Sequence, residues 1–118
     1  MKSLLLISRQ SPYGGSYAHE ALDIALSAAA FDISVSLLFM DDGVYQLLKG
    51  QQPMHNHTKK LESVLSALPL YDINDLWVER ESMTARGVAS DALSQPAKPI
   101  ASAEIAALVS SFDRMLTI

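Results

Sequence analysis

The sequence predicts a single α/β domain in which helices cover both faces of a mostly parallel sheet. Short apolar runs alternate along the chain with longer segments whose apolar residues recur every three or four positions. Runs such as 3–8 and 33–40 are typical of strands buried on both faces, and the periodic segments are typical of amphipathic helices. This alternation favours parallel strands joined by helical crossovers. The length of 118 residues fits one domain that spans 1–118.

The first half of the chain predicts two strands, one long helix and one short helix. Residues 3–8 form the first strand, and a turn rich in Pro and Gly leads to a helix at 16–30, with Ser16 placed to cap it. This helix is rich in alanine, which suits close packing against a sheet or another chain. Residues 33–40 form the second strand, and 43–48 form the short helix.

The second half of the chain predicts two more helices, a helical turn and up to three strands. Proline ends or interrupts several of these elements because it lacks a backbone donor. The predicted elements are a helix from Thr58 to Pro69, a strand at 76–78, a helical turn that ends at Gly87, a short strand near Ile100, a helix capped by Ser102, and a strand at 114–118.

Composition and charge exclude several classes of protein. The chain has no cysteine, so disulfides, thiolate zinc sites and thiol nucleophiles are excluded within it. The net charge of −4 argues against direct binding of nucleic acid, which needs a basic footprint. No apolar stretch approaches the roughly 20 residues of a membrane helix, and the first apolar run is too short for a signal peptide. We therefore expect a cytoplasmic protein.

Three sets of polar residues invite a chemical interpretation. The glycine pair at 14–15 lacks the spacing of a phosphate-binding loop, so a simple turn is favoured. His55 and His57 have no cysteine or nearby carboxylate to complete a metal site. Asp41 and Asp42 could hold a metal or act as acid and base, but capping of the helix that follows is favoured. The residues therefore predict no catalytic group, metal or cofactor.

Several segments resemble the TusC/DsrF family, small subunits of the bacterial sulfur-relay complexes TusBCD and DsrEFH. They are residues 40–53 after the second strand, then 70–73, 76–78 and 85–87, and finally 112–118. The resemblance spans nearly the whole chain, and the order and spacing of the segments are more specific than any one of them. It implies a DsrE-like three-layer sandwich with a mostly parallel sheet of about five strands.

The resemblance is most informative at Glu79. In the active DsrE-type and TusD-type subunits, a cysteine eight residues before the glycine of a terminal Arg-Gly pair carries persulfide sulfur, and here that position is Glu79 before Gly87. A carboxylate cannot form a persulfide, because a thiolate must hold the sulfur. With Glu79 in place of the cysteine, this chain is expected not to carry sulfur itself. We expect Glu79 to cap the following helix or to act as its first-turn acid.

The resemblance thus implies a non-catalytic subunit of a sulfur-relay complex. Its partners would be TusB/DsrH-like and TusD/DsrE-like subunits in a heterohexamer, a dimer of heterotrimers. In the Tus branch such a complex receives sulfur from TusA and passes it to TusE, toward 2-thiouridine at the tRNA wobble position. In the Dsr branch the same architecture serves sulfur oxidation. Residues 42–48 and 70–73 look closer to the Tus branch.

Two other hypotheses remain open. One is a small enzyme with a pocket at the carboxyl ends of the strands, and the other is a homo-oligomeric structural protein. For the sulfur-relay hypothesis, we expect contacts with other subunits along the alanine-rich helix and at the rim of the sheet, where apolar and tyrosine side chains usually mark an interface. The residues predicted at that rim are Asp42, Val44, Tyr45, Leu47 and Leu48.

Overall fold

Five parallel strands form one sheet in the computed structural model, which describes residues 2–12, 15–48 and 56–118, without the side chains at 56–60 and 62. The strand order is β4-β3-β2-β1-β5, and every neighbouring pair is parallel. The strands are β1 (Ser3–Ser8), β2 (Ser34–Phe39), β3 (Asp75–Glu79), β4 (Lys98–Ile100) and β5 (Arg114–Thr117). The predicted parallel α/β sheet is confirmed.

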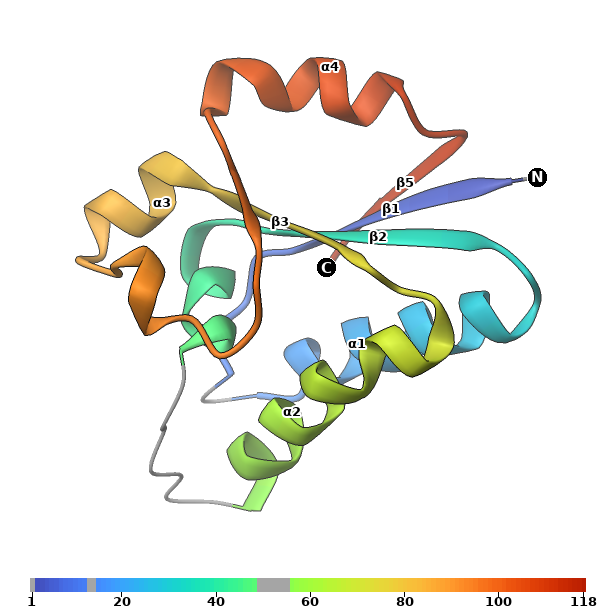
Figure 1. The fold of residues 1–118 in the computed structure, drawn as a ribbon, viewed down its shortest axis with the longest axis horizontal. Coiled ribbons are helices and arrows are strands. Elements are labelled where there is room, and N and C mark those ends of the chain that lie inside the picture. The colour runs from blue at the N-terminus through green and yellow to red at the C-terminus, as the bar shows by residue number, and fades with distance from the viewer. Residues whose placement is uncertain (1, 13–14, 49–55) are drawn as a thin grey trace.

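Helices cover both faces of this sheet. Figure 1 shows α1 and α2 on one face and α4 on the other, while α3 lies beyond the carboxyl ends of the strands. The three connections from β1 to β4 move in one direction across the sheet, and the connection from β4 to β5 returns to the far side of β1. Because such connections are right-handed, this reversal places α4 on the face opposite α1 and α2. The helices are α1 (Tyr17–Ala30), α2 (Asn56–Ala67), α3 (Arg80–Ala85) and α4 (Ile105–Ser110). Of the helices in the described ranges, none is long and apolar enough to cross a membrane.

Short 3-10 helices make up most of the remaining regular structure. They are η1 (Asp41–Leu47), η2 (Leu68–Tyr71), η3 (Ser90–Ala92) and η4 (Ser102–Glu104). The predicted helix at 43–48 is therefore η1, which begins two residues earlier. The helix predicted from Thr58 begins at Asn56, so Thr58 lies inside it. The last helix is shorter than predicted, because η4 takes up its first turn.

The two faces of the sheet bury unequal amounts of apolar surface. On the α1 and α2 face, Leu6, Leu37 and Phe39 are fully buried in one core with residues of both helices. On the α4 face, the fully buried strand residues are fewer, and the helix covers them with partly buried side chains. These helix residues are Ile105, Leu108 and Val109. The α4 layer is the thinner of the two.

Candidate functional site at the carboxyl edge of the sheet

Polar residues at or just after the ends of four strands lie along the carboxyl edge of the sheet. Ser8 ends β1, Asp41 follows β2, Glu79 ends β3 and Ser102 follows β4. Open parallel α/β sheets bind their ligands at this edge. The hydrogen bonds of these residues therefore determine which side chains remain available to a ligand.

Glu79 is buried, with 7% of its surface exposed, and both of its carboxylate oxygens are occupied. Its Oε1 accepts a hydrogen bond from the Ser82 hydroxyl, and its Oε2 accepts one from the Ser102 hydroxyl at 2.9 Å. Glu79 occupies the N-cap position of α3, as predicted, but its side chain makes no capping hydrogen bond. The predicted capping role is wrong, because the two hydroxyls hold the carboxylate instead.

Ser82 and Ser102 extend the contacts of Glu79 to neighbouring segments. The Ser82 hydroxyl accepts a hydrogen bond from the backbone N–H of Asp41 at 2.8 Å, which ties α3 to the end of β2. Ser102 was predicted to cap the last helix, but its hydroxyl donates to Glu79. Its backbone N–H donates to Glu81 at 3.0 Å, and this bond is the main cause that lowers the pKa of Glu81.

Asp41 and Asp42 form ion pairs and do not cap η1. Arg9 contacts Asp41 with 2.6 Å between Nε and Oδ2, and Arg86 contacts Asp42 with 2.9 Å between Nε and Oδ1. Within η1, no side chain caps the first turn. The capping interpretation is therefore wrong. The arginines lie 32 and 44 positions away in sequence, so local sequence patterns could not identify these pairs.

A buried glutamine, which the sequence analysis did not single out, completes this edge. Gln46 is only 1% exposed, and its Nε2 donates to the Ser8 hydroxyl at 2.7 Å and to the backbone carbonyl of Gln10 at 2.8 Å. A polar residue inside the apolar pattern of η1 was the only signal in the sequence. The Ser8 hydroxyl is thus held by an amide, and an amide cannot activate it as a general base would.

The five residues predicted to form an interface divide into two groups. Val44 and Leu47 are fully buried in the core of this chain, so their side chains are not available to a partner in this conformation. Asp42 is exposed, and Tyr45 and Leu48 are partly buried. The apolar density that motivated the prediction thus belongs partly to the core. The accessible members are Asp42, Tyr45 and Leu48.

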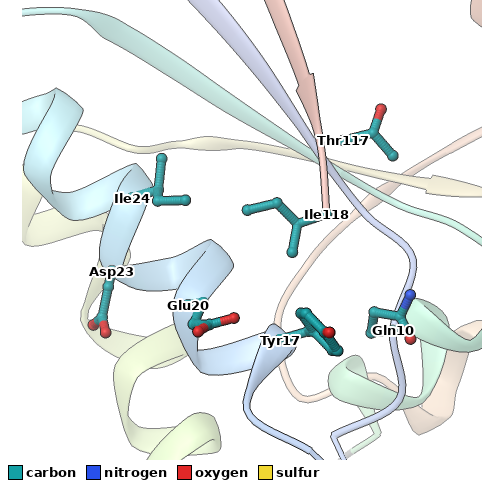
Figure 2. A pocket seen from close by; sticks show the side chains of 7 residues that line it. All are labelled: Gln10, Tyr17, Glu20, Asp23, Ile24, Thr117 and Ile118. Atoms are coloured by element: carbon teal, nitrogen blue, oxygen red, sulfur yellow. The ribbon is translucent and has the colours of Figure 1, made fainter.

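An open groove lies beside this edge, between α1 and β5. It has a volume of about 580 Å³, and Figure 2 shows side chains of both elements around it. The lining residues are Gln10, Tyr17, Glu20, Asp23, Ile24, Thr117 and Ile118. No sequence pattern predicts this groove, because it depends on the pairing of the last strand with the first.

The described residues contain no group of three or more side chains that could hold a metal ion. Of the residues considered for a metal site or a phosphate loop, His55 and Gly14 lie outside the described residues, as does the side chain of His57. Gly15 forms a bend before α1, where an added Cβ would lie in ordinary contact with the Tyr17 ring.

Comparison with known proteins places this arrangement in a family. The model of the DsrE/DsrF-like family matches residues 2–118. The chain belongs to the DsrE/DsrF-like family. A TusC homolog of Pseudomonas aeruginosa is 43% identical over 117 residues, which cover 99% of this chain and 98% of the relative. The intracellular sulfur oxidation protein DsrF of Allochromatium vinosum is 41% identical over 93 residues, which cover 79% of this chain and 68% of the relative.

The DsrE/DsrF-like fold is also seen in a solved structure. The crystal structure of the ychN protein from E. coli superposes with a TM-score of 0.85 and covers 100% of both chains. The two sequences are 21% identical, so this likeness concerns the fold alone. It confirms the predicted DsrE-like sandwich.

Proposed function

We propose that this chain is a non-catalytic subunit of a cytoplasmic sulfur-relay complex of the TusBCD type, which supports persulfide transfer toward 2-thiouridine at the tRNA wobble position. The observation that carries the proposal is the near full-length match to a TusC homolog by a chain that has no cysteine. Such a chain can support sulfur transfer by other subunits but cannot hold persulfide sulfur itself.

The geometry around Glu79 supports a structural role at the position that matches the sulfur-carrying cysteine of active subunits. Both carboxylate oxygens accept hydrogen bonds from serine hydroxyls, and the side chain is buried. A general base needs an oxygen that a substrate proton can reach, and only 7% of Glu79 is exposed. Asp41 and Asp42 are paired with arginines, which also disfavours the alternative of a small enzyme at this edge.

A subunit of sulfur oxidation, as in a DsrEFH-type complex, is the second candidate. The DsrF relative is nearly as similar in sequence, at 41% identity. The match to this relative covers 79% of the chain, against 99% for the TusC homolog, and this difference favours the Tus branch.

The proposed partners are TusB/DsrH-like and TusD/DsrE-like subunits, in a dimer of heterotrimers that exchanges sulfur with TusA-like and TusE-like proteins. Co-expression with these two subunits should give a complex with equal amounts of the three chains. With a labelled persulfide donor, label that dithiothreitol removes should appear on the TusD-like chain and be absent from this chain. Purification of this chain free of both partners, with turnover of its own, would contradict the proposal.

Tyr45 provides a test of where the partners bind. We expect Tyr45→Ala to weaken assembly by about 2 kcal/mol if this residue anchors the interface, which is roughly a thirtyfold loss of affinity. Tyr71→Ala is the matched control, because Tyr71 is exposed on η2. Titration of the TusB-like and TusD-like chains against both variants makes the measurement. Equal affinity of the two variants would show that Tyr45 only covers the core.

A further inference from the structure

The strand β5 exposes an open edge. Among the described residues, only β1 pairs with it. The N–H of Ile118 donates to Ile7 and its carbonyl accepts from Arg9, both at 2.9 Å, so Ile118 faces β1. Because successive residues of a strand alternate in direction, the backbone groups of Met115 and Thr117 point outward. Unpaired groups of this kind are a template for another strand.

The side chains along this edge favour contact with protein. Met115 is 47% exposed and Leu116 is 40% exposed. Natural edge strands are usually protected by lysine, proline or a bulge, and the strand Arg114–Thr117 has none of these. Its one charged residue is Arg114.

The two ends of this edge carry charges of opposite sign. Glu20 and Asp23 line the groove beside Ile118, and Arg114 begins β5 at the other end. None of these three charged side chains has an ion pair within the described residues. By strand alternation, Arg114 and Leu116 share the face of Ile118, which packs against the core beneath α1.

We propose that two copies of this chain pair antiparallel through β5, about a two-fold axis at Leu116. In this register the outward backbone groups of Met115 bond those of Thr117 in the second copy, and the reverse pair forms across the axis. Arg114 then lies opposite Ile118 of the second copy, next to the acidic groove. The strand is therefore self-complementary in hydrogen bonding, apolar contact and charge, as a two-fold interface requires.

A second copy fits this edge better than an unrelated strand does. An unrelated strand would have to carry its own acidic and basic groups at the matching positions, whereas antiparallel self-pairing places the cationic end beside the acidic end twice. The inference does not depend on the proposed function. It is compatible with that function, since a dimer of heterotrimers contains two copies of this chain.

Charge reversal tests the proposed register. Light scattering of the full chain should give a dimer, and Arg114→Glu should raise its dissociation constant at least tenfold. Adding Glu20→Lys and Asp23→Lys to Arg114→Glu reverses both ends and should restore the dimer. Arg80→Glu is the control, because Arg80 is an exposed basic residue on α3, at a distance from β5. Circular dichroism and the melting temperature establish that each variant is folded.

The two-fold axis has its own test. Leu116→Asp places two carboxylates directly opposite each other, with Cβ atoms about 5 Å apart, and should give a folded monomer. A wild-type chain that is monomeric, or a dimer that persists in both Arg114→Glu and Leu116→Asp, would overturn the proposal. So would a dimer lost in Arg114→Glu that the added reversal of Glu20 and Asp23 does not restore.

Discussion

At the scale of residues, Glu79 shows how one buried carboxylate joins separate segments of the carboxyl edge. It connects α3 through Ser82 and the β4 end through Ser102, and Ser82 in turn holds the backbone of Asp41. Burying a carboxylate costs free energy unless hydrogen bonds compensate it. The two hydroxyls supply that compensation, so the contacts should contribute measurably to stability.

Replacement of Glu79 should therefore destabilise the fold. We expect Glu79→Ala to lower the free energy of unfolding by about 1–3 kcal/mol, because the Ser82 hydroxyl loses its buried acceptor. Glu79→Gln should cost less, since its carbonyl still accepts one hydrogen bond. Glu104→Ala is the control, because Glu104 is exposed and makes no capping bond. Urea unfolding of the three variants decides it, and equal midpoints for Glu79→Ala and Glu104→Ala would contradict the expectation.

Glu81 should make stability depend on pH on the acidic side. The backbone N–H of Ser102 is the first cause that lowers its pKa below the ordinary value of 4.5. A carboxyl whose pKa is lower in the folded state adds stability above its unfolded pKa and loses it as the pH falls through the folded pKa. Glu81→Gln should thus lower the melting temperature at neutral pH, and this difference should shrink below pH 4.5. A difference that stays constant with pH would refute this role.

At the scale of elements, the close packing of η1 on β1 holds the site together. A Cβ on Gly43 would lie 2.0 Å from the backbone carbonyl oxygen of Ser8, so only glycine fits there. The same close approach lets Gln46 reach Ser8 and lets Asp41 reach Ser82. The contacts that η1 makes at the edge thus depend on this one backbone crossing.

Gly43→Ala adds only one methyl group, but it should destabilise the fold strongly. We expect a loss of about 3 kcal/mol or more in unfolding free energy, because backbone atoms must move apart. Gly15→Ala is the matched control, since its added methyl group would lie 3.8 Å from the nearest atom, the Tyr17 ring. Thermal melts of the two variants make the comparison. A Gly43→Ala chain as stable as Gly15→Ala would show that η1 moves away from β1 at little cost.

The elements also show what the sequence could predict. Runs such as 3–8 and 33–40 were identified because strands buried on both faces must be apolar throughout. Even the short β4 was expected near Ile100, and Pro99 is tolerated within it because β4 lies at the sheet edge. The site was less predictable, because Asp41 and Asp42 pair with arginines far away in sequence, and the carboxylate of Glu79 also binds the distant Ser102. Local patterns favour capping for such residues, and long-range contacts override them.

At the scale of the whole molecule, the unequal layers predict unequal sensitivity to core mutations. Leu22 of α1 is 2% exposed within the larger core, whereas Leu108 of α4 is only partly buried. We expect Leu22→Ala to cost about 2–5 kcal/mol and Leu108→Ala clearly less. Amide hydrogen exchange should correspondingly protect α1 more than α4. Equal costs, measured by urea unfolding, would mean that α4 is covered more fully than its side chains indicate.

The pairing of β5 with β1 also affects the chain while it is being made. During synthesis, β1 through β4 and their helices emerge before β5 does. Until β5 arrives, the outer side of β1 presents unpaired backbone groups beside the apolar side chains of Leu5, Leu6 and Ile7. Exposed strand edges of this kind recruit other nascent chains. A chain in which β1 through β4 have formed but β5 has not yet paired with β1 is thus the form that most needs a chaperone, and a variant whose β5 pairs slowly should aggregate more.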